Sequence, residues 1–154
     1  MTGSMDIARI LEDGPRAARF ALAGNAATPP EALYYLMADN EPAIRAAVAG
    51  NPSGPHQTFL TLATEQDDAV RQALATRLAA LAPGLPPAQQ GRVAQVAWAA
   101  LAKLAEDAAE EIRATIAEAV KDLPDAPRGM MLALARDTSL RVAEPDQNTS
   151  DPTA

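Results

Sequence analysis

One sequence pattern recurs along this chain, first at intervals of 26 residues, and each copy contains an arginine. Arg19, Arg45 and Arg71 are spaced 26 apart, and Arg113 and Arg141 follow after further intervals of 42 and 28. An apolar pair and an acidic turn precede each arginine, and an apolar run follows it. Self-similarity at a period of about 20 to 50 residues is typical of stacked repeat architectures. The sequence therefore predicts a repeat protein in which each unit contacts mainly its neighbours.

Composition predicts that the repeating units are helical. Apolar residues make up 48% of the 154 residues, yet only 3% are aromatic, and alanine supplies much of the apolar fraction. Alanine is the strongest helix former, and its small side chain lets helices pack close together. We therefore expect an all-α fold, a right-handed α-solenoid of about five helical pairs.

Breaks in the apolar pattern divide the chain into one repeat domain and a tail. The domain covers 1–143, and the polar segment 144–154 is predicted to be a disordered tail. The expected helical pairs occupy 5–25, 28–51, 54–82, 87–123 and 127–143.

Capping signals place the helix boundaries of the second unit. Thr28 is a candidate N-cap, Pro29 suits the first helical position, and Glu31 would complete a capping box. Asp39 is expected to end this helix and to cap the next one. Further along, 87–106 is apolar on most sides, which predicts one long helix packed between neighbouring units.

Charge and composition exclude several classes of function. The formal net charge of −7 argues against nucleic-acid binding, which depends on clustered lysine and arginine. No stretch reaches the roughly 18 apolar residues that a membrane span needs, and the start, 1–11, lacks the apolar run of a signal peptide. We therefore expect a cytoplasmic protein without nucleic-acid or membrane partners.

Cofactor, metal and catalytic signals are weak. The chain has no cysteine and a single histidine, His56, and its acidic residues are spread along the repeats instead of converging. His56 has no serine, cysteine or carboxylate partner recurring nearby. The carboxylate pairs at 67–68 and 110–111 stand at predicted helix N-termini, where the helix dipole favours negative charge. We expect no metal, no cofactor and no enzymatic activity.

Two segments carry a resemblance to known repeat families. The turn Asn-Pro-Ser-Gly-Pro at 51–55, followed by Leu-Ala at 62–63 and Val-Arg at 70–71, resembles the leucine-rich repeat variant, a bacterial helical repeat. The segment Glu-Ile-Arg-Ala-Thr-Ile-Ala-Glu at 111–118 and Val-Ala-Glu-Pro at 142–145 resemble a bacterial HEAT-like family, domain of unknown function 2336. These resemblances imply paired helices and protein interaction, without a catalytic residue.

The chain also departs from both families. The leucine-rich repeat variant resembles a protein with a cysteine-ligated iron–sulfur cluster ahead of its repeats, which a chain without cysteine cannot hold. In the second family the segment equivalent to 142–145 leads into further helices, whereas a polar tail begins here at Asp146. The chain therefore resembles a shortened member of that family.

The arginine series has two interpretations. In the first, each arginine binds the acidic turn of a neighbouring unit, such as Asp39, Glu65 or Asp107, or free carbonyls at helix ends. In the second, the guanidinium groups form a cationic stripe that recognises carboxylates or a phosphorylated segment. Both interpretations concern the same residues, namely Arg19, Arg45, Arg71 and Arg113.

Two aromatic residues are further candidates for a binding surface. Trp98 lies off the apolar stripe of its helix, so it is expected to pack against an adjacent repeat or, alternatively, to anchor a partner in a groove. Tyr35 lies opposite the apolar side chains Leu33 and Leu36, and we expect it to be exposed.

The sequence thus favours a non-catalytic protein-binding scaffold or adaptor that uses a groove lined by the second helix of each pair. The candidate partner-binding residues are Arg19, Tyr35, Arg45, Arg71, Trp98 and Arg113. A self-associating regulatory fragment or homodimer is an alternative, because a solenoid end without a polar cap favours dimerisation. A HEAT-like DNA glycosylase or a lyase-type enzyme is a further alternative, against which the acidic charge counts.

Overall fold

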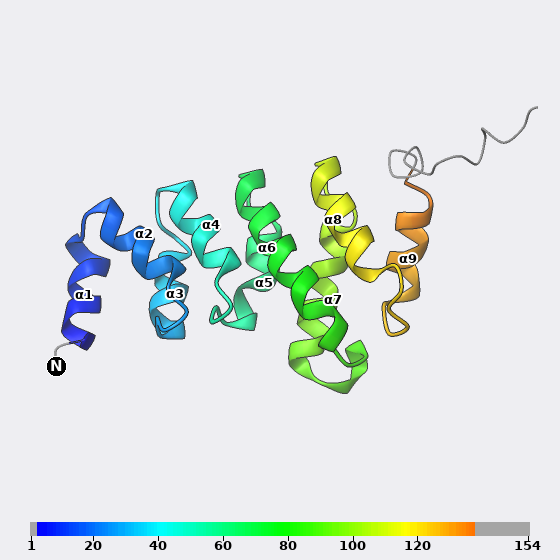
Figure 1. Ribbon diagram of the computed structural model, residues 1–154, viewed down its shortest axis with the longest axis horizontal. Helices are drawn as coiled ribbons and strands as arrows, with labels where there is room; N and C mark the ends of the chain where they lie inside the picture. The colour runs from blue at the N-terminus through cyan, green and yellow to red at the C-terminus, as the bar shows by residue number, and fades with distance from the viewer. Residues whose placement is uncertain (1–2, 138–154) are drawn as a thin grey trace, which may run out of the picture.

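The structure is a computed structural model that describes residues 3–137, and every regular element in that range is a helix (Figure 1). The predicted all-α class is therefore confirmed for this range. The end of the fifth predicted pair, 138–143, lies outside the described residues. The last arginine of the series, Arg141, and the tail 144–154 lie outside them as well.

The helices alternate between two layers. The first-helix layer comprises α1 (Gly3–Asp13), α3 (Pro30–Leu36), α5 (Phe59–Ala63), α7 (Arg92–Leu104) and α9 (Arg128–Ala135). The second-helix layer comprises α2 (Arg16–Gly24), α4 (Pro42–Gly50), α6 (Asp68–Leu81) and α8 (Glu110–Val120). Short 3₁₀ turns lie at His56–Thr58 (η1), Ala82–Gly84 (η2) and Ala88–Gln90 (η3).

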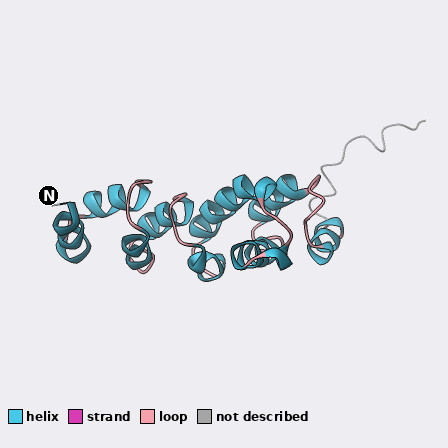
Figure 2. Ribbon diagram, turned by 90° about the horizontal axis from the view of Figure 1, so that it is seen from below, coloured by secondary structure: helices cyan, strands magenta, loops and turns pink. Residues whose placement is uncertain are grey.

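These two layers run side by side along an elongated molecule (Figure 2). In the second-helix layer α2 contacts α4, α4 contacts α6, and α6 contacts α8; in the other layer α1 contacts α3 and α5 contacts α7. The chain therefore advances from α1 at one end to α9 at the other, and most contacts join elements close in sequence (Figure 1).

The core is a strip of aliphatic side chains between the layers. Ile44 and Val48, one turn apart on α4, are buried against Leu33 and Leu36 of α3 in a small N-terminal cluster. A larger cluster continues from the end of α4 to α9. In contrast, none of the side chains at 6–13 in α1 is buried, so this helix is held less tightly than the others.

The helix start predicted at Thr28 is wrong. Helix α3 begins at Pro30 after Pro29, and no side chain caps it. The Thr28 hydroxyl instead donates a hydrogen bond of 2.6 Å to the carbonyl of Leu22 at the end of α2, which also accepts the backbone N–H of Asn25. The prediction that Asp39 caps the next helix is also wrong: Glu41 occupies the N-cap position of α4, and no side chain caps that helix. The Asp39 carboxylate accepts the backbone N–H of Glu41 at 3.0 Å, in the turn that precedes α4.

The single helix predicted over 87–106 is divided. After the η3 turn, Gly91 adopts extended backbone at φ 164° and ψ 159°, and α7 begins only at Arg92. Glycine loses more conformational freedom in a helix than other residues, so the apolar pattern does not carry the helix through this position. Helix α6 runs to Leu81, which agrees with the predicted end of the third helical pair at 82.

Candidate functional site

The four described arginines of the series make the same pair of contacts. Each Nε donates to a carboxylate of the following unit: Arg19 to Asp39 at 2.7 Å, Arg45 to Glu65 at 2.9 Å, Arg71 to Asp107 at 2.7 Å and Arg113 to Asp137 at 2.6 Å. Each Nη1 donates to a backbone carbonyl of the preceding turn, at Gly14, Asp39, Glu65 and Asp107 respectively. The arginine ladder formed by these pairs confirms the structural interpretation of the series.

The electrostatics of the ladder agree with this geometry. The hydrogen bond to Asp39 raises the pKa of Arg19, and the same bond lowers the pKa of Asp39. At the third pair, burial acts to raise the pKa of Asp107, but the hydrogen bonds from Arg71 and from the Ala109 amide outweigh it and hold that pKa below its ordinary value. Each guanidinium therefore already holds a carboxylate, and the row is not an unpaired cationic stripe.

The two aromatic candidates differ in their environment. Trp98 is only 1% exposed, and its indole N–H donates to the carbonyl of Pro86 at 2.8 Å. Its assignment as a groove anchor is therefore wrong, and the packing interpretation holds. Tyr35 is 57% exposed, as predicted, and Tyr34 beside it is 54% exposed, which the sequence reasoning missed.

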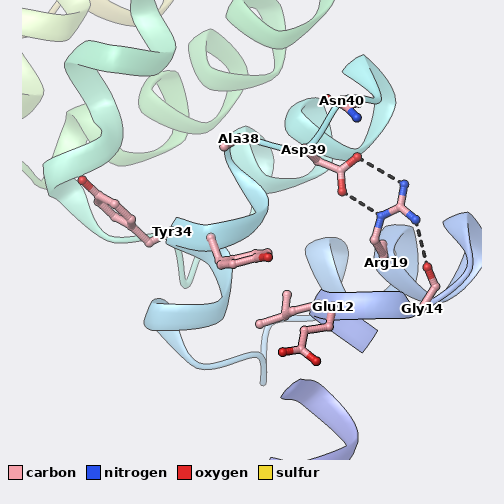
Figure 3. Close-up of a pocket in the computed structure, with 9 residues that line it drawn as sticks. Glu12, Gly14, Arg19, Tyr34, Ala38, Asp39 and Asn40 are labelled. Carbon is pink, nitrogen blue, oxygen red and sulfur yellow. Dashed lines mark hydrogen bonds and ion pairs between the residues drawn. The ribbon is translucent and has the colours of Figure 1, made fainter. Parts of the chain in front are cut away.

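Tyr35 and Arg19 meet at a hollow of about 580 Å³ between α1 and α3 (Figure 3). Figure 3 shows Glu12 and Tyr34 at this hollow together with the ion pair of Arg19 and Asp39. The polar groups here are a carboxylate, phenol hydroxyls and an already paired guanidinium. This chemistry suits hydrogen bonding to a partner; within the described range no three histidine, cysteine, aspartate or glutamate side chains are placed to bind a metal.

A second surface lies on the second-helix layer, and we call it the second-helix face. It consists of four positions per helix that recur in the arginine register and lie on one side of each helix. These positions are Ala17, Phe20, Ala21 and Gly24 on α2; Ala43, Ala46, Ala47 and Gly50 on α4; Ala69, Gln72, Ala73 and Thr76 on α6; and Glu111, Ala114, Thr115 and Glu118 on α8. All are exposed or half-buried. The side chains at these positions are therefore uncharged and mostly small on α2, α4 and α6, and two of the four are glutamates on α8. The exposed guanidinium of Arg16 lies 5.9 Å from the ring centroid of Phe20, at the N-terminal end of this face.

Arg77 is a further residue that the sequence reasoning missed. Its Nη2 donates to the carbonyls of Gly54 at 2.8 Å and Pro52 at 3.3 Å, and its guanidinium lies 4.8 Å from the ring centroid of Phe59. Its Nε and Nη1 are buried and have no hydrogen-bond partner. Burial lowers the pKa of Arg77. The sequence carried a signal for it, because Arg77 stands one 26-residue period after Asn51.

Comparison with protein-family models, with curated proteins and with solved structures finds no match for this chain. The resemblance of 51–55 and 111–118 to two helical-repeat families is therefore a prediction from the residues alone. In the part of the chain that the structure describes, no helix combines the length and apolar character needed to cross a membrane.

Proposed function

We propose that this protein is a non-catalytic protein-binding scaffold, built as a right-handed α-solenoid of about five HEAT-like or leucine-rich-variant helical pairs. The second-helix face binds the partner. The observation that carries the proposal is the row of uncharged, mostly small side chains at the positions of this face on α2, α4 and α6, in a chain whose net charge is −7. Depletion of charge at an exposed patch is a compositional signal of protein interfaces.

Small side chains make this face suitable for close contact. Alanine and glycine have no side-chain rotamers to immobilise, so this protein loses little side-chain entropy when a partner packs against them. Phe20, which is 45% exposed, supplies the one large apolar group of the face on the described helices. Aromatic side chains of this kind dominate the binding energy of many interfaces.

The arginine ladder supports the same function by fixing the face. Each ladder arginine connects its own helix to the acidic residue of the next unit, so α2, α4, α6 and α8 are tied in sequence. A surface that is already ordered binds without paying the cost of ordering. The ladder is thus a framework for the binding surface and not the surface itself.

Affinity capture from native cell extract tests the proposal. The test variant Ala21→Glu, Ala43→Glu adds charge to two exposed alanines of the face, and the control Ala8→Glu, Ala99→Glu adds the same charge to exposed alanines of α1 and α7. We expect a specific protein to be retained by wild type and control and lost by the face variant, with equal unfolding temperatures. A partner retained equally by the face variant would contradict the assignment of this surface.

The nature of the captured protein separates the scaffold from its alternative. Recovery of a different protein supports an adaptor. Recovery of only the same chain, with a mass that doubles in light scattering as concentration rises, supports the self-associating dimer. Failure of wild type to retain any specific protein contradicts the proposed function.

A further inference from the structure

Arg77 has more hydrogen-bonding capacity than its structural contacts use. A guanidinium has five N–H donors, and its hydrogen bonds to the carbonyls of Pro52 and Gly54 both come from Nη2. The amide of Asn51 stands at the equivalent position and uses its Nδ2 for the same purpose, donating to Ala23 and Asn25. An asparagine is therefore sufficient to tie one unit to the previous turn. Arg77 adds a positive charge and three donors, on Nε and Nη1, that have no acceptor.

The added charge is not balanced by a carboxylate of the described chain. The ladder arginines and Arg16 each pair with an aspartate or glutamate, whereas the contacts of Arg77 are two neutral carbonyls and the Phe59 ring. A buried charge without a counter-ion is costly. The same charge gains more from an incoming anion than a solvated surface arginine would, because water screens it less.

A hollow of about 520 Å³ lies beside this guanidinium, and we call it the Arg77 hollow. Apart from Arg77 it is lined by apolar or small residues, including Pro52, Ala73, Ala80 and the exposed Leu81. Its size falls in the range of about 300–1,000 Å³ that is usual for ligand clefts. The occupant that suits it carries one negative charge together with an aliphatic group.

We propose that the Arg77 hollow binds the C-terminal residue of the protein partner, with the free carboxylate on Arg77 and an aliphatic side chain against Leu81. A C-terminal residue carries both groups on one α-carbon, so both can enter one small hollow. An internal glutamate or aspartate brings backbone amides on both of its sides along an apolar wall, whereas a C-terminal residue brings them on one side only, so fewer amides are left without hydrogen-bond partners. The proposal rests on the proposed function, whose partner it specifies.

Binding requires a small rearrangement of Arg77. Nε and Nη1 are covered in the free protein, so the guanidinium turns toward the hollow about its side-chain torsions as the carboxylate enters. The longer hydrogen bond, to Pro52 at 3.3 Å, is the contact that this turn releases first. Two parallel N–H donors of the fork then match the two carboxylate oxygens, which is the bidentate geometry that favours arginine over lysine.

The position of the hollow agrees with a partner lying on the second-helix face. Gly50, Ala73 and Thr76 belong both to that face and to the lining of the hollow. A segment that runs along α4 and α6 can therefore place its last residue beside Arg77. Charge complementarity identifies the occupant, because the contacts of Arg77 in the described chain are two neutral carbonyls and an aromatic ring, without a carboxylate.

The test uses the smallest molecule with these two groups. N-acetyl-leucine is titrated into the isotope-labelled protein, and its amide, N-acetyl-leucinamide, serves as the uncharged control; the Nε–Hε resonance of Arg77 is followed by NMR. We expect saturable shifts with a dissociation constant of about 1 to 10 mM for the carboxylate and binding at least tenfold weaker for the amide. Equal binding of both compounds, or none up to about 50 mM, overturns the proposal.

Two variants locate the binding. Arg77→Gln removes the charge and keeps an amide donor for the Gly54 carbonyl, as Asn51 does in the preceding unit, while Arg92→Gln removes an exposed arginine outside the hollow. We expect Arg77→Gln to weaken N-acetyl-leucine binding at least tenfold and Arg92→Gln to leave it unchanged. If Arg77→Gln unfolds, Arg77→Lys replaces it. The comparison of N-acetyl-leucine with N-acetyl-leucinamide on the wild-type protein then still tests the proposal.

The two proposals fail in different ways. If the captured partner is lost by the face variant but N-acetyl-leucine does not bind, the scaffold stands and the C-terminal recognition is wrong. If N-acetyl-leucine binds through Arg77 while no partner is captured, the hollow is a carboxylate site and the scaffold function is wrong.

Discussion

Arg77 stands 26 residues after Asn51, and both side chains tie their own helix to the turn of the preceding unit. Asn51 Nδ2 donates to the carbonyls of Ala23 and Asn25 at 2.8 and 2.9 Å, and Arg77 Nη2 donates to those of Gly54 and Pro52. The two residues differ in their position, because Asn51 follows the end of α4 at Gly50 whereas Arg77 lies within α6. Equivalent positions therefore keep one structural role with different side chains.

Removing the Asn51 side chain should destabilise the protein. Asn51 is buried, and its amide oxygen also accepts the backbone N–H of Ser53 at 2.8 Å. Asn51→Ala therefore removes the hydrogen bonds to the carbonyls of Ala23 and Asn25 and the acceptor of the Ser53 N–H, while the Asn25 carbonyl keeps the N–H of Thr28. We expect the free energy of unfolding to fall by about 2–3 kcal/mol in urea denaturation. The control Asn40→Ala, at an exposed position, should change it by less than about 0.5 kcal/mol. Equal effects of the two variants would show that Asn51 is not a structural tie.

The ladder pair of Arg71 and Asp107 should be strongly coupled. Both side chains are largely buried, and two hydrogen bonds of 2.7 and 3.1 Å join them. A double-mutant cycle with Arg71→Met and Asp107→Asn should give a coupling energy of about 1–2 kcal/mol. The exposed pair of Lys121 and Glu118 is the matched control, with an expected coupling below about 0.5 kcal/mol. Similar coupling in both cycles would contradict a structural ladder.

Acid should destabilise the protein through the ladder carboxylates. The pKa values of Asp39 and Asp107 lie below the ordinary value in the folded state, so both groups stabilise the fold above their unfolded pKa of about 3.9. This stabilisation is lost as pH falls through the lower, folded pKa values. Urea denaturation at a series of pH values should therefore show stability falling below about pH 4. Asp107→Asn should be less stable at pH 7 and should lose less of its stability on acidification. If the variant shows the same loss of stability in acid as the wild type, other groups cause the acid dependence.

Gly54 should tolerate a side chain less well than Gly24. A Cβ at Gly54 would lie 2.9 Å from Arg77 Nη1 and 3.3 Å from the Asn51 carbonyl oxygen, whereas a Cβ at Gly24 has no neighbour within 4 Å. We expect Gly54→Ala to cost about 1–2 kcal/mol and Gly24→Ala to be neutral or slightly stabilising, measured by thermal unfolding. The cost of Gly54→Ala should shrink in the Arg77→Gln background, because the guanidinium is the closest atom group. An undiminished cost there would place the clash in the backbone.

Sequence reasoning identified the residues whose environment follows directly from the repeat register. The acidic partners of Arg19 and Arg71 recur in step with the arginines, so stacking brings each pair together without further information. Tyr35 was predicted correctly because a helix separates its apolar side from its exposed side by a fixed angle. Trp98 lies off the main apolar stripe of its helix, so periodicity alone did not decide whether it would be buried or exposed. In the structure it is buried, and its indole N–H donates to the carbonyl of Pro86.

Local signals failed where a tertiary contact used the same group. The Thr28 side chain has the chemistry of an N-cap, but in the folded protein its hydroxyl donates to the carbonyl of Leu22 at the end of α2. Tyr34 lies on the same helix as Tyr35, and its position in the sequence pattern did not indicate that it lines a hollow. Such preferences are worth about 1 kcal/mol, which packing readily overrides.

The amino-acid order by itself determined the helical class and the pairing of arginine with acid, because both depend on spacings of a few residues or one repeat period. Only the tertiary structure decided which donors remained without acceptors. The unused hydrogen-bond donors of Arg77 depend on where α4 ends, how far α6 extends, and how the carbonyls of Pro52 and Gly54 are oriented. A hydrogen bond requires placement within a few tenths of an ångström, and that precision arises from the packing of separate helices against one another.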